Sequence, residues 1–440
     1  MPDSNNRSGA GGILIAAPSS GAGKTTLTLA MLRAFRDLGR SVVSAKSGPD
    51  YIDPKFHEAA SGKICINLDA WAMDPGTLRS MAGAHLAGHE LLLLEGAMGL
   101  FDGAANGRGS AADLAATLGL PVILVIDCAK QAQSVAALVH GFRSYRSDIR
   151  IAGVILNRVG SARHEKMLRT ALCTQDVAVF GSIPRSGDLS LPERHLGLVQ
   201  AGEHADLEEF LARASEICRE NVDLTAIEAA SAVLAPAGAH TARLPAPLGQ
   251  RIAVARDVAF AFSYPHLLDF WQRQGAEISF FSPLADESPA INADAVFLPG
   301  GYPELHAASL FAAENFKAGM RQAAVSGALI YGECGGYMVL GEGLVDGAGT
   351  AHGMLGLLPL ETSFKDRKRH LGYRSINALG GLPWTMSLSA HEFHYASIVA
   401  EGNAERLFST SDADENKLPD MGLRVQNVMG SFAHVIAVQT

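Results

Sequence analysis

The chain has 440 residues, of which 48% are hydrophobic and 18% are charged, and its formal net charge at pH 7 is -9. This length predicts about two to three domains, and the composition is ordinary for a globular protein that can bury large cores. A net negative chain without dense runs of Lys and Arg is poorly suited to nucleic acid. We therefore expect no nucleic-acid partner.

Cysteine usage and hydropathy indicate a reducing compartment and no membrane. The 5 cysteines are widely spread and form no Cys-x-x-Cys pair, so neither a disulfide framework nor a zinc site is predicted. Residues 1–12 are polar and Gly-rich, and no apolar run approaches the length that spans a membrane. We expect a cytoplasmic protein with no secretory signal and no membrane partner.

Residues 13–26 have the pattern of a strand, a phosphate-binding loop and the start of a helix. An apolar run breaks into small residues, ends in Gly-Lys-Thr and continues as a helical pattern over 27–38. Backbone N–H groups of such a loop can face a polyphosphate, Lys24 would reach its β- and γ-phosphates, and the Thr25 hydroxyl would hold Mg²⁺. The loop is a variant, because Pro18 stands where the standard pattern has Gly, and a plain turn with an incidental Lys is the alternative. The nucleotide-binding residues predicted here are Ser20, Gly21, Ala22, Gly23, Lys24, Thr25 and Thr26.

The first half of the chain alternates short Val/Ile/Leu runs with helical patterns, which predicts a parallel sheet covered on both faces. The α/β class follows, and ligands of such sheets bind at the carboxyl ends of the strands. The predicted strands are 13–17, 41–45, 91–94, 122–126 and 151–156, and the predicted helices include 111–118 and 131–145.

Carboxylates follow two of these strands, Asp50 and Asp53 after one and Glu95 and Asp102 after another. Mg²⁺ binds through one or two carboxylates together with phosphate and water, so Asp50 or Asp53 could complete a shell with Glu95 and Thr25. Turn formation explains either Asp taken alone. Glu95 ends a run of four leucines, where a carboxylate is costly unless it is paired or binds a metal.

The residue after the strand 151–156 is Asn157. Its side-chain amide could hydrogen-bond an adenine edge, and loop capping is the equal alternative. We include Asn157 among the predicted nucleotide-binding residues.

A change of composition divides the chain. Residues 235–250 are rich in Ala and Pro without helical or strand periodicity, which predicts a linker between a first domain, 1–234, and a second domain, 251–440. The second domain is again α/β. Its predicted strands include 251–255, 277–281 and 295–298, and its predicted helices are 265–274 and 306–325.

Within the second domain, the sequence Gly-Glu-Cys-Gly-Gly at 332–336 follows an apolar run and precedes a helical pattern. It places Cys334 on a tight elbow at a helix N-terminus, a position that lowers the pKa of a thiol and favours the nucleophilic thiolate. A buried structural Cys is the alternative. The nucleophile needs a base, and among His391, His394 and His434 the context favours His434.

The segment Pro-Gly-Gly-Tyr-Pro-Glu at 299–304 follows another predicted strand. Its backbone N–H groups could stabilise an oxyanion, and an ordinary turn explains it almost as well. We predict Gly301 and Gly335 as the oxyanion-binding residues.

These motifs carry a family resemblance. The elbow at 332–336 and the Pro-Gly-Gly segment resemble a class I glutamine amidotransferase domain, whose sheet is flavodoxin-like, and the first half resembles dethiobiotin synthetase, a P-loop enzyme. Both halves in this order resemble the cobyrinic and hydrogenobyrinic acid a,c-diamide synthases. The motifs are Ser-Ser-Gly-Ala-Gly-Lys-Thr-Thr at 19–26, Gly-Pro-Asp-Tyr-Ile-Asp-Pro at 48–54, Glu-Gly-Ala-Met-Gly-Leu-Phe-Asp-Gly at 95–103, Gly-Gly-Tyr-Pro-Glu-Leu at 300–305 and His-Glu-Phe-His-Tyr at 391–395.

The resemblance implies a cobalamin-pathway ligase that takes a corrin-type tetrapyrrole acid, L-glutamine and ATP. ATP phosphorylates the c and then the a side-chain carboxylate, and glutamine-derived ammonia displaces phosphate. It implies Mg²⁺ at Thr25, Asp53 and Glu95, with Cys334 and His434 as a catalytic dyad. The implied substrate-binding residues are Asp50, Tyr51 and Asp102.

One departure from the wider class concerns the dyad. A Glu usually stands two residues after the His, and here that place is Ile436, so the group that orients His434 is open. The stretch 391–394 offers two His three residues apart, a weak metal pattern.

Three alternatives remain at this point: cobyric acid synthase, an enzyme that amidates a nickel sirohydrochlorin, and a P-loop regulatory ATPase with a non-catalytic amidotransferase-like module. The overall resemblance favours the metal-free, hydrogenobyrinic acid substrate. We also expect a homodimer.

Overall fold

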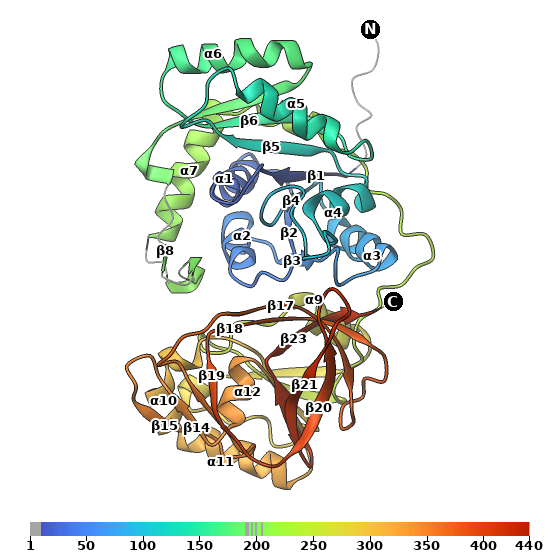
Figure 1. Ribbon diagram of the computed structural model, residues 1–440, viewed down its shortest axis with the longest axis vertical. Coiled ribbons are helices and arrows are strands. Elements are labelled where there is room, and N and C mark those ends of the chain that lie inside the picture. Colours follow the sequence, from blue (N-terminus) through green and yellow to red (C-terminus); the bar gives the residue numbers. More distant parts are fainter. Residues whose placement is uncertain (1–9, 190–192, 195–196, 199, 204–205, 440) are drawn as a thin grey trace. The chain divides into compact units, whose positions relative to one another are not determined.

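The computed structural model describes residues 10–189, 193–194, 197–198, 200–203 and 206–439 (Figure 1). Residues 1–9, for which we expect no secretory signal, lie outside that description. The chain separates into two compact units, Met1–Ala242 and Arg243–Thr440, and the division falls inside the segment 235–250. Each unit is described by itself.

The first unit is built on a seven-stranded sheet in which the described strands are all parallel, in the order β3-β2-β4-β1-β5-β6-β7 (Figure 1, blue to green). Parallel strands place all their carboxyl ends at one edge, so the loops after β1, β2 and β4 meet there. The strands are β1 Gly11–Ala16, β2 Val42–Ser47, β3 Cys65–Leu68, β4 Leu91–Glu95, β5 Val122–Asp127, β6 Ile151–Val159 and β7 Ala178–Pro184, and β8 Glu193–Arg194 pairs with β9 Gly197–Leu198 outside the sheet.

Helices cover both faces of this sheet. Right-handed crossovers place α1 and α2 on one face and α3 to α6 on the other, and α7 and α8 pack with α1 and α2 in one apolar core. The helices are α1 Lys24–Asp37, α2 Asp53–Ser61, α3 Pro75–Leu86, α4 Ala111–Leu118, α5 Val135–Tyr145, α6 Ala162–Leu172, α7 Leu207–Asn221 and α8 Leu224–Ala230. The α/β class predicted for this half is confirmed.

Local sequence explains which boundaries were predictable. α4 agrees with its predicted range, because Ser110 and Asp113 form a capping box at its start and Gly119 ends it with φ 70°. The predicted helix 131–145 begins only at Val135. β3 and β7 were not predicted, since the first is a short edge strand and the second is interrupted by Gly and Ser.

The second unit contains a ten-stranded mixed sheet in the order β11-β10-β12-β13-β22-β21-β20-β17-β18-β23 (Figure 1, yellow to red). The five strands β11, β10, β12, β13 and β22 pair with their neighbours in parallel, whereas the pairs from β22 through β21, β20, β17 and β18 to β23 are antiparallel. The antiparallel half was not predicted. The strands of this sheet are β10 Arg251–Ala255, β11 Glu277–Phe281, β12 Ala295–Leu298, β13 Leu329–Glu333, β17 His370–Ala378, β18 Leu388–His394, β20 Glu405–Ser411, β21 Lys417–Val425, β22 Val428–Ser431 and β23 Ala433–Val438.

A smaller sheet and four described helices complete the second unit. The small sheet has the order β15-β14-β16-β19, and its strands are β14 Gly343–Val345, β15 Ala351–Gly353, β16 Leu360–Ser363 and β19 Ser397–Glu401. The helices are α9 Pro265–Arg273, α10 Ala307–Ala312, α11 Glu314–Val325 and α12 Gly335–Leu340. Separate apolar cores lie on the two faces of the large sheet, one containing residues of α9 and the other residues of α10, α11 and α12. The α/β class is therefore confirmed here as well.

The single helix predicted over 306–325 is wrong. The chain leaves helical geometry at Ala313, whose ψ is 82°, and this residue is 4% exposed. The Lys317 ammonium then donates to the Phe311 carbonyl oxygen at 2.6 Å. This carbonyl lies in the last turn of α10 and would otherwise lack a hydrogen-bond donor at the helix end. Periodicity alone does not show such a break, because both helices bury the same kind of residue.

The last residues of the segment 235–250 pack within the second unit. The indole N–H groups of Trp271 and Trp384 donate to the carbonyl oxygens of Pro245 (3.0 Å) and Ala246 (2.8 Å). Leu248 is 6% exposed. Across the described ranges, no helix combines the length and the apolarity that crossing a bilayer requires.

Candidate active sites

The loop after β1 has the backbone of a phosphate-binding loop. Gly21 and Gly23 adopt φ 79° and 91°, a left-handed conformation that suits glycine, and α1 begins at Lys24. Asn157 donates to the Ala22 carbonyl oxygen at 2.8 Å, and a Cβ on Gly23 would lie 2.3 Å from the Asn157 amide nitrogen. Asn157 thus supports the loop, and its contact with adenine stays a prediction.

Ser20 and Gly21 are exposed at the tip of this loop, and Thr26 is half-buried on the first turn of the helix. Lys24 is 7% exposed, and its ammonium donates to the Met98 carbonyl oxygen at 2.6 Å. Burial lowers the pKa of Lys24, although Glu95 acts to raise it. A phosphate oxygen could replace that carbonyl oxygen as the acceptor of the Lys24 ammonium.

The carboxylates at this edge of the sheet form a cluster around Thr25. The Thr25 hydroxyl donates to Glu95 at 2.7 Å and lies 3.3 Å from Asp53. Glu95 is completely buried at the end of β4, and Asp53 begins α2. The structure therefore brings together the three residues predicted to bind the metal.

Two further residues belong to this cluster and were given no role from the sequence. The Lys46 ammonium contacts Asp53 at 2.5 Å and Glu95 at 2.7 Å, and the His57 ring nitrogen Nε2 contacts the other Glu95 oxygen at 2.7 Å. His57 lies four residues after Asp53 in α2, on the same helix face, and this spacing is the signal that could have found it. Lys46 is the penultimate residue of β2 and Glu95 is the last residue of β4, and the two are cross-strand partners.

The cluster keeps its groups charged despite burial. Burial opposes ionisation of Glu95, but Lys46 and His57 hold the pKa of this carboxyl far below its usual range. Burial likewise opposes the charge on Lys46, and Asp53 and Glu95 raise its pKa above the usual value. The pKa of His57 is raised to about 10, because Cys65 and Glu95 outweigh the effect of burial.

The predicted substrate-binding residues have different surroundings. Asp50 accepts the backbone N–H groups of Ile52 at 2.8 Å and Asp53 at 3.1 Å, so it forms the turn before α2, and burial together with Asp53 raises its pKa to about 6. Tyr51 is half-buried in that turn. Asp102 is exposed and accepts the Gly99 N–H at 3.0 Å.

In the second unit, Cys334 lies at the elbow between β13 and α12. Its backbone has φ 48° and ψ -103°, a strained conformation for a residue with a side chain. The Cys334 N–H donates to the Ser431 carbonyl oxygen at 2.8 Å, and the thiol lies 3.7 Å from the Phe393 carbonyl oxygen. A Cβ on Gly336 would lie 2.0 Å from the Leu298 carbonyl oxygen, so only glycine fits at that position.

The expected lowering of the Cys334 pKa is wrong for this structure. Burial raises the pKa of the thiol well above its usual value, and Glu304 adds to the effect, whereas the Gly335 N–H acts in the opposite direction. The side chain is 4% exposed, and α12 has only 6 residues. Desolvation of the thiolate therefore outweighs the helix N-terminus.

His434 is 2% exposed and lies beside the Pro-Gly-Gly segment, because a Cβ on Gly300 would be 2.3 Å from its ring carbon Cε1. Burial and the neighbouring His391 lower the pKa of His434 to about 3, so the ring is neutral. Its Nδ1 atom lies 3.8 Å from an oxygen of Glu333, the residue immediately before Cys334.

The other two candidate bases, His391 and His394, have surroundings that differ from those of His434. Both ring nitrogens of His394 have partners, the Ala396 carbonyl oxygen and Glu392, each at 3.0 Å. His391 is the cross-strand partner of His434, and burial lowers its pKa to about 4. His370, Glu392 and His394 could converge on a cation, but Arg374 already pairs with Glu392 at 2.7 Å.

The predicted oxyanion residues, Gly301 and Gly335, lie side by side. A Cβ on Gly335 would be 3.0 Å from the Gly301 backbone nitrogen. Both residues are buried. Two backbone segments thus meet next to Cys334, and their role as an oxyanion site stays a prediction.

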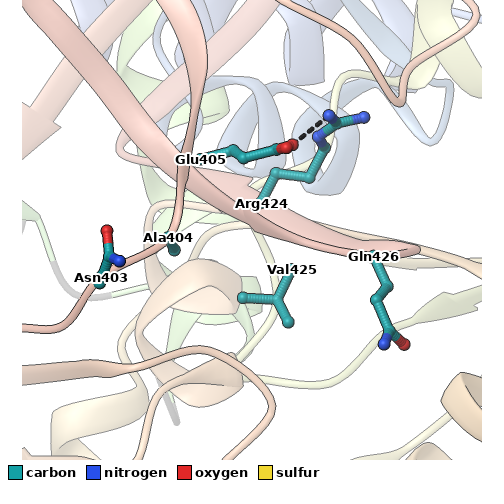
Figure 2. Close-up of a pocket in the computed structure, with 6 residues that line it drawn as sticks. All are labelled: Asn403, Ala404, Glu405, Arg424, Val425 and Gln426. Atoms are coloured by element: carbon teal, nitrogen blue, oxygen red, sulfur yellow. Dashed lines mark hydrogen bonds and ion pairs between the residues drawn. The ribbon is translucent and has the colours of Figure 1, made fainter.

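A surface pocket near the start of β20 and the end of β21 lies apart from this chemistry (Figure 2). It is lined by Asn403, Ala404, Glu405, Arg424, Val425 and Gln426, and its charged pair, Glu405 and Arg424, is mutually neutralised. It contains no nucleophile, and we assign it no catalytic role.

The fold and the two sites define a class: a nucleotide-binding α/β unit followed by an amidotransferase-type α/β unit in one chain. Family models agree with both parts. Residues 13–199 match the CobQ/CobB/MinD/ParA nucleotide binding domain, and residues 251–440 match the CobB/CobQ-like glutamine amidotransferase domain.

Curated relatives define the family more closely. The chain is 59% identical over 430 residues to the hydrogenobyrinate a,c-diamide synthase of Brucella suis, covering 97% of this chain and 98% of that protein. It is 58% identical to the protein of that name from Rhizobium meliloti (97% and 99% covered) and 50% identical to the one from Mesorhizobium japonicum (97% and 98%). The chain belongs to the hydrogenobyrinate a,c-diamide synthase family, and the resemblance stated above is confirmed.

Proposed function

We propose that this protein is a glutamine-hydrolysing ligase that converts the a and c side-chain carboxylates of hydrogenobyrinic acid to amides, using ATP. The observation that carries the proposal is the presence, in one chain of this family, of a phosphate loop beside paired carboxylates and of a cysteine elbow whose preceding residue, Glu333, lies 3.8 Å from the buried His434. A carboxylate must be activated before an amine can displace its oxygen, and these two sites supply activation and amine.

The first unit would perform the activation. The loop N–H groups and Lys24 bind the phosphates of ATP, and Thr25, Asp53 and Glu95 would hold Mg²⁺. Their three oxygen-bearing side chains already converge, which suits a hard cation. When bound, Mg²⁺ would neutralise phosphate charge. A corrin carboxylate oxygen attacks the terminal phosphorus of ATP, and the bond from that phosphorus to the bridging oxygen breaks. ADP departs, and the corrin side chain becomes an acyl phosphate.

Lys46 would prevent Asp53 and Glu95 from repelling each other before the cation arrives, because its ammonium contacts both. A bound cation would take over part of that neutralisation. Lys46 could then turn one of its donors toward a phosphate or a substrate carboxylate. Asp50, Tyr51 and Asp102, in the loops that border this cluster, would contact the substrate.

The second unit would produce ammonia. The Cys334 thiolate attacks the amide carbon of L-glutamine, and the N–H groups near Gly301 and Gly335 would stabilise the oxyanion. His434 takes the thiol proton and returns it to the leaving ammonia, and water then hydrolyses the thioester to glutamate. Ammonia displaces phosphate from the acyl phosphate in the first unit, so each amide consumes one ATP and one glutamine.

The decisive experiment incubates hydrogenobyrinic acid and cobyrinic acid separately with the purified chain, ATP, Mg²⁺ and glutamine, followed by mass spectrometry. We expect hydrogenobyrinic acid to become the diamide and cobyrinic acid to react more slowly. Diamide from neither acid, with glutamine still hydrolysed, would contradict the proposed acceptor. Later corrin acids and a nickel sirohydrochlorin would then be tested. Light scattering of the same sample tests the homodimer that we propose.

A further inference from the structure

We infer that Glu333 is the carboxylate that orients His434 in the amidotransferase site. The inference rests on the proposed glutamine hydrolysis and supplies the group that Ile436 cannot provide. Glu333 is the last residue of β13, immediately before Cys334. It therefore reaches His434 from a different strand, and not from the position two residues after the histidine on β23. Glu333 is therefore a positioning residue that acts on glutamine through His434.

The distances place this carboxyl group beside the correct nitrogen. Glu333 Oε2 lies 3.8 Å from His434 Nδ1, within ion-pair range and longer than a hydrogen bond. Catalytic hydrogen bonds are often long before substrate binds, so a small movement of either side chain would close this contact. A proton held on Nδ1 leaves Nε2 as the nitrogen that can accept the thiol proton.

The other oxygen of the carboxyl group is fixed. Glu333 Oε1 accepts two hydrogen bonds, one from the Tyr331 hydroxyl at 3.1 Å and one from the Val435 backbone N–H at 3.1 Å. Val435 is the residue after His434, so a single carboxyl group ties together the ends of β13 and β23 on which nucleophile and base are carried. This arrangement fixes the direction in which Oε2 faces.

The surroundings explain why a carboxylate is needed here. His434 is deeply buried, and the neighbouring groups that face it are His391, His394 and Glu392, the last already paired with Arg374. Formation of an imidazolium in this place is costly unless a negative charge lies close by. Burial raises the pKa of Glu333 to about 8, and the form that would stabilise the imidazolium is the ionised one, in which Glu333 has released its proton to water.

The test compares glutamine hydrolysis by the full-length wild-type chain, Glu333→Gln, Glu333→Asp and Tyr331→Phe. Gln keeps the size of the side chain and can still accept the Val435 N–H, but it carries no charge. We expect kcat of Glu333→Gln to fall by roughly 10²-fold, the lower part of the range for acid–base assistance, with KM for glutamine changed less than about threefold. Glu333→Asp should recover part of kcat, and Tyr331→Phe, which leaves the carboxylate in place, should lose less than Glu333→Gln.

Two outcomes would overturn the inference. One is a Glu333→Gln variant with kcat within about threefold of the wild-type value. The other is parallel loss of kcat and of thermal stability in both Glu333→Gln and Glu333→Asp, which would indicate a purely structural carboxyl group. Ammonia-dependent amidation in the first unit serves as the internal measure of intact protein. A wild-type chain that fails to hydrolyse glutamine would instead contradict the proposed function.

Discussion

In the first unit, Glu95 lies between the ammonium of Lys46 and the ring of His57, whereas in the second unit His434 lies beside Glu333, a carboxyl group whose pKa burial raises to about 8. The pKa shifts of Lys46, His57 and Glu95 all favour charge. Those of Cys334 and His434 favour the neutral forms. The physical difference is pairing: opposite charges in contact offset desolvation in the first unit, whereas the charged groups that act on the Cys334 thiol, Glu304, Glu333 and Glu392, are all acidic and raise its pKa further.

This contrast suits the two reactions. Phosphoryl transfer to a carboxylate needs fixed charges around a polyanion at every stage, so a permanently ionised cluster is useful. Glutamine hydrolysis needs a thiolate only while substrate is bound, and a buried neutral thiol is protected from oxidation and other electrophiles between turnovers. The predictions below test the contrast from its largest expected consequence to its smallest.

Replacement of Cys334 should abolish the activity proposed for the second unit and leave the activity proposed for the first unit unchanged. Cys334→Ser should lower glutamine-dependent turnover by at least about 10⁴-fold, because the hydroxyl is a far weaker nucleophile in the same place. Amidation with free ammonia should persist at the wild-type rate. Both activities are measured on the same preparation, and Cys173→Ser, at an exposed cysteine, is the control that should retain both. Loss of both activities in Cys334→Ser would make the cysteine structural.

Removal of the central charge in the first unit should have the reverse pattern. Glu95→Gln should reduce ATP-dependent amidation by roughly 10²- to 10³-fold, since it removes the negative charge proposed to help hold Mg²⁺ and leaves Lys46 and His57 underpaired. Glutamine hydrolysis should continue. The control is Glu90→Gln, an acid that pairs with Arg40 at the surface near the opposite end of β4. Unchanged ammonia-dependent amidation in Glu95→Gln would remove Glu95 from the metal site.

The free energy of unfolding should depend on pH because His57 is charged within the cluster. Its folded-state pKa is about 10 against an ordinary 6.5, so its stabilising contribution is complete below pH 6.5 and is lost as pH rises through 10. His57→Gln should lower the free energy of unfolding at pH 6 by on the order of 3 kcal/mol and flatten the decline between pH 6.5 and 10. Urea unfolding followed by a probe in the first unit measures both quantities.

An unaltered slope in His57→Gln would show that the ring is not charged in the folded state. The comparison with the second unit sharpens this test, because His434 has the opposite shift. Its pKa of about 3 means that its contribution is present above pH 6.5 and is lost as pH falls toward 3. The two units should therefore lose histidine-linked stability in opposite pH directions.

The sequence allowed prediction of features that depend on short stretches of chain. The phosphate loop, the strands β10, β11 and β12, and the elbow at Cys334 each follow from residue types within a few positions of one another. The convergence of Thr25, Asp53 and Glu95 was also predictable, because parallel strands bring their carboxyl ends to one edge.

Features that depend on distant neighbours were not predictable in the same way. Lys46 and His57 have no motif of their own, and their roles follow from contacts with Glu95, which is 49 and 38 positions away. The helix break at Ala313 is concealed because the apolar pattern continues through it. The roles of Asn157 and Asp50 in supporting turns also depend on which backbone groups the fold places next to them.

By itself, the sequence determined the α/β class, the order of the two units and the places of Cys334 on an elbow and of Lys24 in a phosphate-loop motif, because these are local patterns of residue type and spacing. Only the tertiary structure decided the charge states. A thiol at a helix N-terminus is expected to be acidic, yet burial raises the pKa of Cys334; a carboxylate after four leucines is expected to be costly, yet Lys46 and His57 hold Glu95 ionised. Desolvation and Coulomb interactions depend on every neighbour in space, and the fold alone brings those neighbours together.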